Sequence, residues 1–173
     1  MPNKSVIKIL TIANKSDAQF LSRKVPATDI KKLDKKTASK LIQEMKATMR
    51  AAAGIGLSAN QVGLNTRLFV AEVPSGRGSG MKFYAVFNPE IIRKSTELLE
   101  AEEGCLSVPD VFGQVERAEK IAIKGLDVYG KPIKIKAWGL LARVFQHETD
   151  HLNGKLFIEM AKKTHKLKAK TEN

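Results

Sequence analysis

The sequence lacks the features that mark secreted and membrane proteins. Its 173 residues include one cysteine, Cys105, so no disulfide can form within the chain. No apolar run approaches the roughly 20 residues that a membrane-spanning helix needs. The first residues, MPNKSVIKILTIANK, show neither the apolar core of a signal peptide nor the arginine-rich composition of a transit peptide. These absences predict a cytoplasmic protein with no membrane contact.

Aromatic residues are also few, at 6% of the chain, whereas the net charge reaches +12. Such an excess of lysine and arginine favours a polyanionic partner, with nucleic acid the obvious candidate. However, the sequence shows no RNA-stacking signature, no zinc-finger spacing and no clear helix-turn-helix pattern. We therefore expect no sequence-specific recognition of nucleic acid.

Helical and strand-like patterns alternate along the chain. Apolar residues at three- and four-residue spacing predict a helix that begins after Asp34 and stops near Gly54, and a second helix over residues 139–154. Between them lie apolar runs typical of strands, including a predicted hairpin around Gly130. Two helices among several short strands predict a single α+β domain, which we expect to span residues 1–160.

The segment QHETDH places two histidines four residues apart on the second predicted helix. Residues at this spacing lie on one helix face, about 6 Å apart along the axis, so His147 and His151 could bind one metal ion. Glu148 lies beside them and could handle a proton of a bound water, which is the logic of the H-E-x-x-H motif. The pattern indicates a metal site, although two surface histidines on a salt-bridged helix would have the same spacing.

A catalytic site of this kind needs a third protein ligand. Six positions after the second histidine, where one class of metalloprotease has another histidine, this chain has Phe157. Three further candidates lie downstream but are poorly placed for a buried ligand: Glu159, His165 and Glu172. Upstream, the segment EAEEGCLSVPD contains Cys105, and a thiolate is a strong ligand for zinc or ferrous iron. A Cys/His/His site with an open fourth position is therefore chemically sensible.

Three segments in this order, GIGLSANQVG, EGCLSVP and QHETDHLNG, closely resemble the signature motifs of the peptide deformylases. The resemblance covers nearly the whole domain. It implies an α+β fold in which antiparallel β-sheets wrap around a central metal-binding helix, the one that carries H-E-x-x-H. It also implies the reaction, which is removal of the N-formyl group from the N-terminal methionine of newly synthesised polypeptides, with release of formate.

The resemblance implies that the metal ligands are Cys105, His147 and His151. A metal-bound hydroxide would attack the formyl carbon, with Glu148 as the general acid/base that takes the proton of the water and delivers it to the departing amine. One divalent metal ion per chain is implied, with Fe2+ favoured and Zn2+, Ni2+ or Co2+ able to replace it.

Further roles follow from the same resemblance. Gln61 and the backbone N–H of Leu106 would stabilise the oxyanion that forms on the formyl group. The implied substrate-binding residues are a glycine that lets the substrate backbone approach and three apolar residues around the methionine side chain: Gly56, Ile55, Leu140 and Val144.

Some positions depart from the common pattern of the family or have an open role. Ser58 and Asn60 stand where small apolar residues, Pro or Thr are more usual, and Asn60 could alter how the next residue, Gln61, is held. Phe112 stands where some members carry a basic residue near the substrate entrance. Three charged residues, Asp150, Arg117 and Glu103, could hold the predicted metal ligands in place. Asp150 could be the partner of an imidazole or of Arg117, and Glu103 could anchor the Cys105 loop.

Residues 161–173 are rich in lysine and are expected to form a basic tail, either a helix or a disordered arm. In bacterial deformylases a C-terminal helix can dock on the ribosome, where the nascent substrates emerge. Here the lysines would contact phosphates, and the contact would weaken with salt. The residues concerned are Lys162, Lys163, Lys166, Lys168 and Lys170. A merely solubilising tail would have the same composition.

Two other functions remain open at the level of sequence. A zinc peptidase that cleaves peptide bonds would make Cys105 dispensable. A basic RNA- or ribosome-binding module with a structural metal would make Glu148 and Gln61 replaceable, and protein ligands would fill all four metal positions. Because the sequence offers no obvious fourth ligand, it favours catalysis.

Overall fold

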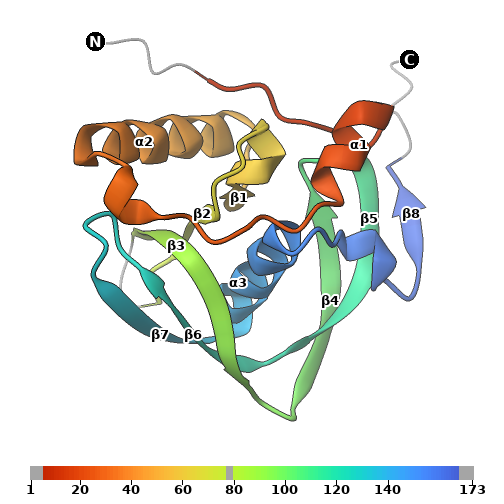
Figure 1. Cartoon of the computed structure of the whole chain (residues 1–173). Helices are drawn as coiled ribbons and strands as arrows, with labels where there is room; N and C mark the ends of the chain where they lie inside the picture. Colours follow the sequence, from red (N-terminus) through yellow and green to blue (C-terminus); the bar gives the residue numbers. More distant parts are fainter. Residues whose placement is uncertain (1–5, 77–79, 168–173) are drawn as a thin grey trace.

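Two antiparallel sheets, with one helix between them, organise the fold (Figure 1). The computed structural model describes residues 6–76 and 80–167 of the chain. The central helix, α3 (Gly139–Leu152), contacts strands of both sheets. This arrangement confirms the expected α+β class with antiparallel sheets.

The larger sheet has five strands in the order β1-β2-β3-β6-β7. Its strands are β1 (Gly56–Ser58), β2 (Leu68–Pro74), β3 (Met81–Lys94), β6 (Lys120–Leu126) and β7 (Pro132–Trp138). The strands β6 and β7 form the predicted hairpin, with Gly130 in the turn between them at a φ of 76°. Positive φ is the backbone conformation that glycine adopts readily, so the turn explains the glycine there.

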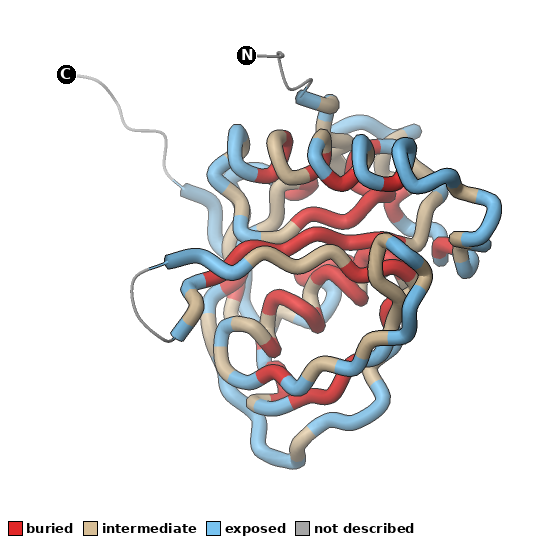
Figure 2. The backbone as a smooth tube through the Cα atoms, turned by 90° about the vertical axis from the view of Figure 1, so that its left-hand side faces the viewer, coloured by how far each residue is buried: buried red, intermediate tan, exposed pale blue. Residues whose placement is uncertain are grey.

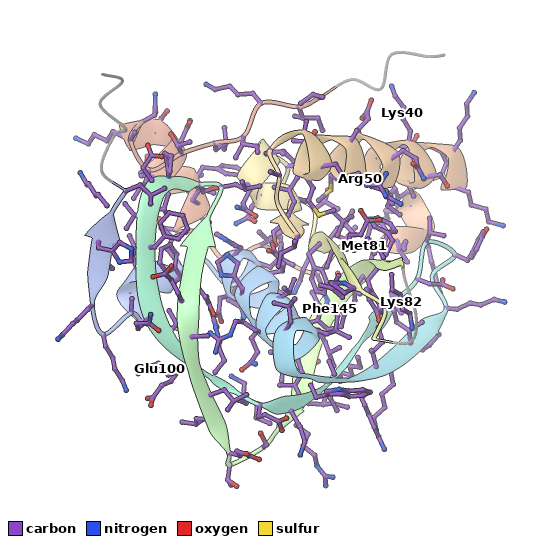
Figure 3. The ribbon with its side chains drawn as sticks, turned by 180° about the vertical axis from the view of Figure 1, so that it is seen from behind. Lys40, Arg50, Met81, Lys82, Glu100 and Phe145 are labelled. Atoms are coloured by element: carbon purple, nitrogen blue, oxygen red, sulfur yellow. The ribbon has the colours of Figure 1, made fainter. Side chains whose placement is uncertain are left out.

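Strand β2 is buried on both faces because it lies between two apolar cores. Phe69 and Val73 belong to the core around α3, whereas Leu68 and Val70 belong to the core beneath helix α2. Since successive side chains of a strand point to opposite faces, a strand between two cores shows a continuous apolar run. Phe145 of α3 packs on this sheet, with its ring centroid 5.2 Å from that of Phe69 (Figure 3).

The smaller sheet has three strands in the order β4-β5-β8. They are β4 (Leu98–Cys105), β5 (Val108–Ala118) and β8 (Thr164–Lys166). Strands β4 and β5 form a long hairpin whose turn contains Leu106 and Ser107. This hairpin brings the only cysteine to the C-terminal half of α3.

The remaining elements are helices, of which α2 covers the larger sheet and η3 contacts the smaller one. They are α1 (Lys15–Leu21), η1 (Ile30–Lys32), α2 (Lys35–Ala51), η2 (Ala59–Val62) and η3 (Phe157–Glu159). Asp34 is the N-cap of α2, as predicted, because its side chain accepts a hydrogen bond from Thr37 N at 3.0 Å. One face of α2 is buried against the sheet and the other is exposed, whereas α3 lies deep in the molecule (Figure 2).

The expected tail differs from the structure in part. Residues Thr164–Lys166 form neither a helix nor a disordered arm, because they pair with the free edge of β5 and place His165 opposite Phe112. The expected boundary after residue 160 remains a prediction, and β8 lies beyond it. Lys168 and Lys170 lie outside the described residues. Within the described part of the chain, no helix has the length and apolar character that crossing a membrane requires.

Candidate active site

Helix α3 carries five of the predicted site residues: Leu140, Val144, His147, Glu148 and His151. Glu148 is 3% exposed and His151 is 1% exposed, so both are withdrawn from water. The helix is followed by Gly154, which has a φ of 73°. An added Cβ there would lie 2.4 Å from Ser22 O, so only glycine fits this close approach of two backbones. This contact fixes the end of the helix that carries the histidines.

Cys105, His147 and His151 direct their ligand atoms toward a common point. His151 Nε2 lies 3.1 Å from Cys105 Sγ and 3.1 Å from His147 Nε2. All three ligand atoms lie within 4.8 Å of one another. A thiolate and two imidazoles are a donor set that suits zinc or ferrous iron. The three residues could therefore hold a metal ion, and the structure brings the predicted ligands together.

The charges of the two imidazoles also fit a cation at this point. Burial lowers the pKa of His147, but the neighbouring Cys105, Glu103 and Glu148 outweigh it and raise the pKa to about 10. The pKa of His151 is lowered well below its usual value, first by burial and then by the positive charge of His147. The surroundings thus favour a positive charge on His147 and a neutral His151, and a metal cation bound between the two rings would take the place of that charge.

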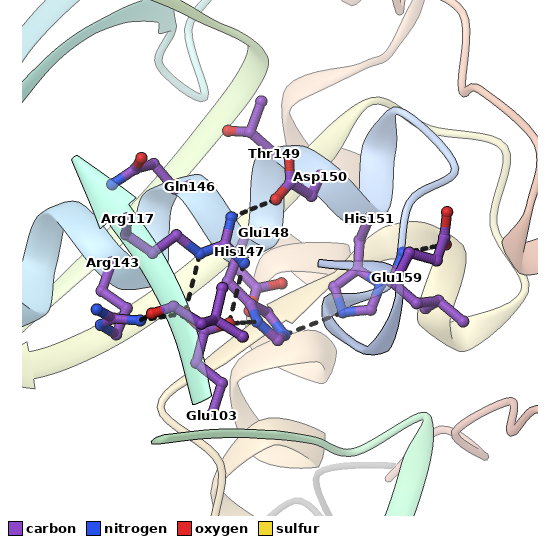
Figure 4. Close-up of polar contacts among 12 residues, drawn as sticks. Glu103, Arg117, Arg143, Gln146, His147, Glu148, Thr149, Asp150, His151 and Glu159 are labelled. Carbon is purple, nitrogen blue, oxygen red and sulfur yellow. Dashed lines mark hydrogen bonds and ion pairs between the residues drawn. The ribbon is translucent and has the colours of Figure 1, made fainter. Parts of the chain in front are cut away.

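A charged network lies behind His147 and fixes its ring (Figure 4). Glu103 Oε2 lies 3.0 Å from His147 Nδ1, so the other ring nitrogen, Nε2, is left to face the site. Glu103 also accepts two hydrogen bonds from Arg117, both at 2.9 Å, and one from Arg143 at 2.7 Å. Arg117 in turn pairs with Asp150. A carboxylate on the outer nitrogen of a ligating histidine is a common support in metal sites.

Burial pushes the pKa of Glu103 upward, yet the hydrogen bonds from Arg117 and His147 more than compensate and hold it well below its usual range. Glu103 is therefore ionised. The hypothesis that Asp150 pairs with Arg117 agrees with the structure. Glu103 does more than anchor its own loop, because it connects two arginines with His147.

On the opposite side of the site, neutral groups surround Gln61. Its Oε1 accepts a hydrogen bond from Ser58 N at 2.9 Å, so its amide nitrogen points the other way. That nitrogen donates to Ser107 Oγ at 3.1 Å and lies 3.5 Å from Cys105 Sγ. The side chain is 2% exposed. Gln61 therefore presents an N–H group beside the three candidate ligands.

The carboxylate of Glu148 lies between the helix and strand β1. Its Oε2 accepts a hydrogen bond from Ser58 Oγ at 2.8 Å. Burial raises the pKa of Glu148 to about 7, and the positive charge of His147 and the Ser58 hydroxyl limit the increase. An added Cβ at Gly56 would lie 2.3 Å from Glu148 Oε1, so the space that a side chain would fill at Gly56 is taken by this carboxylate. The glycine is thus needed for Glu148 itself.

A pocket of about 590 Å³ opens onto these groups. It is lined by the following predicted residues: Ile55, Gly56, Gln61, Cys105, Leu106, Leu140, Val144, His147 and Glu148. His151, the third candidate ligand, is not part of this lining and lies buried beside Cys105 and His147. Phe112 and Arg143 also line the pocket. The apolar residues and the polar groups thus share one cavity, as in an enzyme site that holds an apolar side chain next to the reacting bond.

The comparison with protein families agrees with this geometry, because residues 8–167 match the family model of the polypeptide deformylases. The chain belongs to this family. A peptide deformylase of Halothermothrix orenii is 47% identical over 151 residues, covering 87% of this chain and 92% of that protein. Among solved structures, the peptide deformylase of Thermotoga maritima matches with a TM-score of 0.79 and 37% identity, over 92% of this chain and 99% of that one. A class I type b peptide deformylase from Acinetobacter baumannii matches with a TM-score of 0.82 and 34% identity, over 91% and 99%.

Membership of the deformylase family confirms the expectation of an enzyme, a hydrolase that removes formyl groups from polypeptides. Two residues of the deformylase site were missed by the sequence reasoning. Arg143 precedes His147 by four residues, and this helical spacing could have revealed that it lies on the same face as His147, where both contact Glu103. Ser107 gave no such signal, because its contact with Gln61 joins residues 46 positions apart.

Proposed function

We propose that the chain is a metal-dependent peptide deformylase that removes the formyl group from the N-terminal methionine of newly synthesised polypeptides and releases formate. The observation that carries this proposal is the meeting of Cys105, His147 and His151 at the wall of a pocket that also holds Glu148 and Gln61. Family membership supports the same reaction.

The residues that would hold the metal are Cys105, His147 and His151. When bound, a divalent ion would lower the pKa of water and so supply a nucleophile at neutral pH. The donor set suits both ferrous iron and zinc, and we favour ferrous iron on the resemblance to the family, with nickel or cobalt as further substitutes. Glu103 would keep the His147 ring in the tautomer whose Nε2 faces the ligand group.

Glu148 is proposed as the general acid/base. Its pKa of about 7 lies close to neutral pH, where a group can both take and return a proton. The Ser58 hydroxyl holds one carboxylate oxygen at 2.8 Å and thereby limits its rotation. Glu148 would accept a proton from the attacking water and pass it to the amine of methionine as the formyl group leaves.

Gln61 and the backbone N–H of Leu106 are proposed as the donors to the oxyanion. The amide nitrogen of Gln61 lies 3.5 Å from Cys105 Sγ, so it is next to the ligand group rather than deep in the protein. Leu106 follows Cys105 in the β4–β5 turn and lines the pocket. Donors aimed at the developing negative charge lower the barrier because they need no reorganisation during the reaction.

The apolar part of the pocket is proposed to bind the methionine side chain. It includes Ile55, Leu140 and Val144. Gly56 follows Ile55 in the chain and lies against the carboxylate of Glu148. The similar structure from Acinetobacter baumannii was solved with Met-Ala-Ser bound. This supports an N-formylmethionyl peptide as the substrate of the present chain.

Formate release tests the proposal directly. We expect protein purified without oxygen to release formate from an N-formylmethionyl peptide, and a Cys105→Ser variant to lose both metal and activity. The same peptide without its formyl group serves as the control, because a peptidase would cleave it and a deformylase would leave it intact. Cleavage of the unformylated peptide, or full activity of the variant, would contradict the proposal.

Docking of the tail on the ribosome stays a prediction. Lys162 is bonded to Glu100 at 2.8 Å and to Glu116 at 2.9 Å, so it is less available for phosphates than its sequence suggests. Lys163 and Lys166 remain exposed. If residues 161–173 dock, their deletion should lower cosedimentation with ribosomes at low salt, and unchanged cosedimentation would refute the docking.

A further inference from the structure

Two residues shortly before Gln61 in the chain connect the turn η2, which contains Gln61, to the helix α3. Ser58 and Asn60 are both 0% exposed. The one hydrogen of Ser58 Oγ is shared between the backbone carbonyl of Glu148, at 2.9 Å, and Oε2 of the same residue, at 2.8 Å. Asn60 Nδ2 donates to the backbone carbonyl of His151 at 2.7 Å. These carbonyls are three residues apart, so they lie on one side of α3. The two hydrogen bonds therefore connect one short turn to one helix face at two points.

Gln61 follows directly and depends on this turn. Its Oε1 accepts from Ser58 N, so the orientation of the Gln61 amide is set by the backbone at Ser58. With Oε1 engaged, the NH₂ end faces Ser107 and Cys105. Any shift of the turn relative to α3 would move this NH₂ group relative to Glu148 and the histidines.

The bond made by Asn60 is not required by the helix. The carbonyl of His151 already accepts from Gly154 N at 3.0 Å. Moreover, Asn60 Oδ1 is buried and has no partner among the described residues. Burying a polar atom without a partner opposes folding, so an apolar residue would fill this position at least as well. Stability alone therefore does not account for an asparagine here.

We propose that Ser58 and Asn60 are positioning residues, a two-point clamp that fixes the Gln61 amide relative to Glu148 and the ligand group on α3. The inference rests on the proposed function, since it assigns Gln61 the role of oxyanion donor. A misplacement of about 1 Å at a reacting group can lower a rate by roughly 100-fold. The clamp acts by preventing such a shift between two separate elements, η2 and α3.

The experiment compares Asn60→Ala with the control Thr48→Val. Thr48 is also buried, at 1% exposure, and donates to the Glu44 carbonyl at 2.8 Å, but on α2. For Asn60→Ala we expect kcat to fall roughly 10-fold to 100-fold, with KM and metal content unchanged. Thr48→Val should lose stability and keep kcat. Equal kcat in Asn60→Ala and the parent would overturn the clamp.

A double variant separates positioning from a general loss of order. In a Gln61→Ala background, Asn60→Ala should produce no further fall in kcat, because the group that it positions is gone. A fully additive fall would overturn the clamp. If Asn60→Ala does not fold, Asn60→Ser in the same two backgrounds provides the comparison, since it keeps a small polar side chain but is shorter than asparagine and loses the hydrogen bond to His151 O.

A second readout is independent of activity. The side-chain ¹⁵NH₂ signals of Gln61 should shift or broaden in Asn60→Ala and stay unchanged in Thr48→Val, and unchanged signals in both would overturn the clamp. A parent protein that releases no formate would refute the proposed function alone, and the Gln61 signals would then decide whether the clamp exists.

Discussion

On the side of α3 that faces β4 and β5, the site is supported by charges, whereas on the side of β1 and η2 it is supported by neutral hydrogen bonds. Glu103, Arg117 and Asp150 form the charged side, which contacts His147. Ser58 and Gln61 belong to the neutral side, which contacts Glu148 and Cys105. Glu103 and Arg117 are buried, as are Ser58 and Gln61, so the difference does not come from exposure to water.

The comparison shows that the contacts on each side of the site suit the role that we propose for the residue there, His147 on the charged side and Glu148 on the neutral side. A cation at the ligand group gains from a nearby carboxylate, and that carboxylate is kept ionised by arginines. The proposed acid/base, Glu148, must instead keep its pKa close to neutral pH, and a further charged group bonded directly to its carboxylate would move that pKa away. Neutral donors such as the Ser58 hydroxyl orient Glu148 and leave its pKa raised, at about 7.

The largest effect is expected from breaking the charged side. Arg117→Met leaves the buried carboxylate of Glu103 without its main partner and frees Asp150. We expect a loss of about 3 kcal/mol in the free energy of unfolding, the low end for a broken buried pair, because Arg143 still faces Glu103. Urea denaturation measures the loss. Lys162→Met, which breaks two exposed ion pairs, is the control and should change little.

If Arg117→Met and Lys162→Met had equal stability, the charged side would contribute nothing beyond ordinary surface pairs.

A second effect, smaller than the first, concerns the affinity for the metal. Glu103→Gln removes the charge that supports His147 and keeps the shape of the side chain, so metal affinity should fall about 10-fold to 100-fold. Competition with a chelator measures the affinity. Glu100→Gln on the same strand is exposed and should bind metal like the parent.

The smallest effect is expected from an ion pair that lies outside the site. Hydrogen bonds from Arg50, at 2.6 Å, lower the pKa of Glu72 below its usual value. A lowered pKa in the folded state means that the pair stabilises the protein above the unfolded pKa of about 4.3, and that this contribution is lost as the pH falls below it. Glu72→Gln should therefore reduce the change in stability between pH 6 and pH 3, as followed by thermal unfolding. An unchanged pH profile would contradict this.

The sequence predicted the elements and residues whose signals are local. The Asp34 cap, the hairpin around Gly130 and the H-E-x-x-H helix each depend on residues a few positions apart, and the structure has all three. The family motifs predicted that Cys105 lies close to the two histidines. Helical spacing alone could not predict this, because the cysteine lies on another element.

The unpredicted features are contacts between distant segments. Sequence reasoning suggested that Asn60 would change how Gln61 is held by lying beside it, yet its side chain reaches His151 O on α3. The pairing of His165 with Phe112 also could not be foreseen, since a lysine-rich composition indicates charge and says nothing about which strand edge is free. Such contacts depend on tertiary placement rather than on local preference.

Strand β8 has a consequence for how the molecule meets its neighbours. It covers Val111, Phe112 and Gly113 at the outer edge of β5, where unpaired N–H and C=O groups would otherwise face outward. An open strand edge is a template on which a second chain can add its own strand, and this is a common start of aggregation. A chain cut before Thr164 would present that edge to other copies of itself. With β8 in place, the outer edge of the sheet at these residues is a strand of only three residues, and very short edge strands are one way in which proteins limit such pairing.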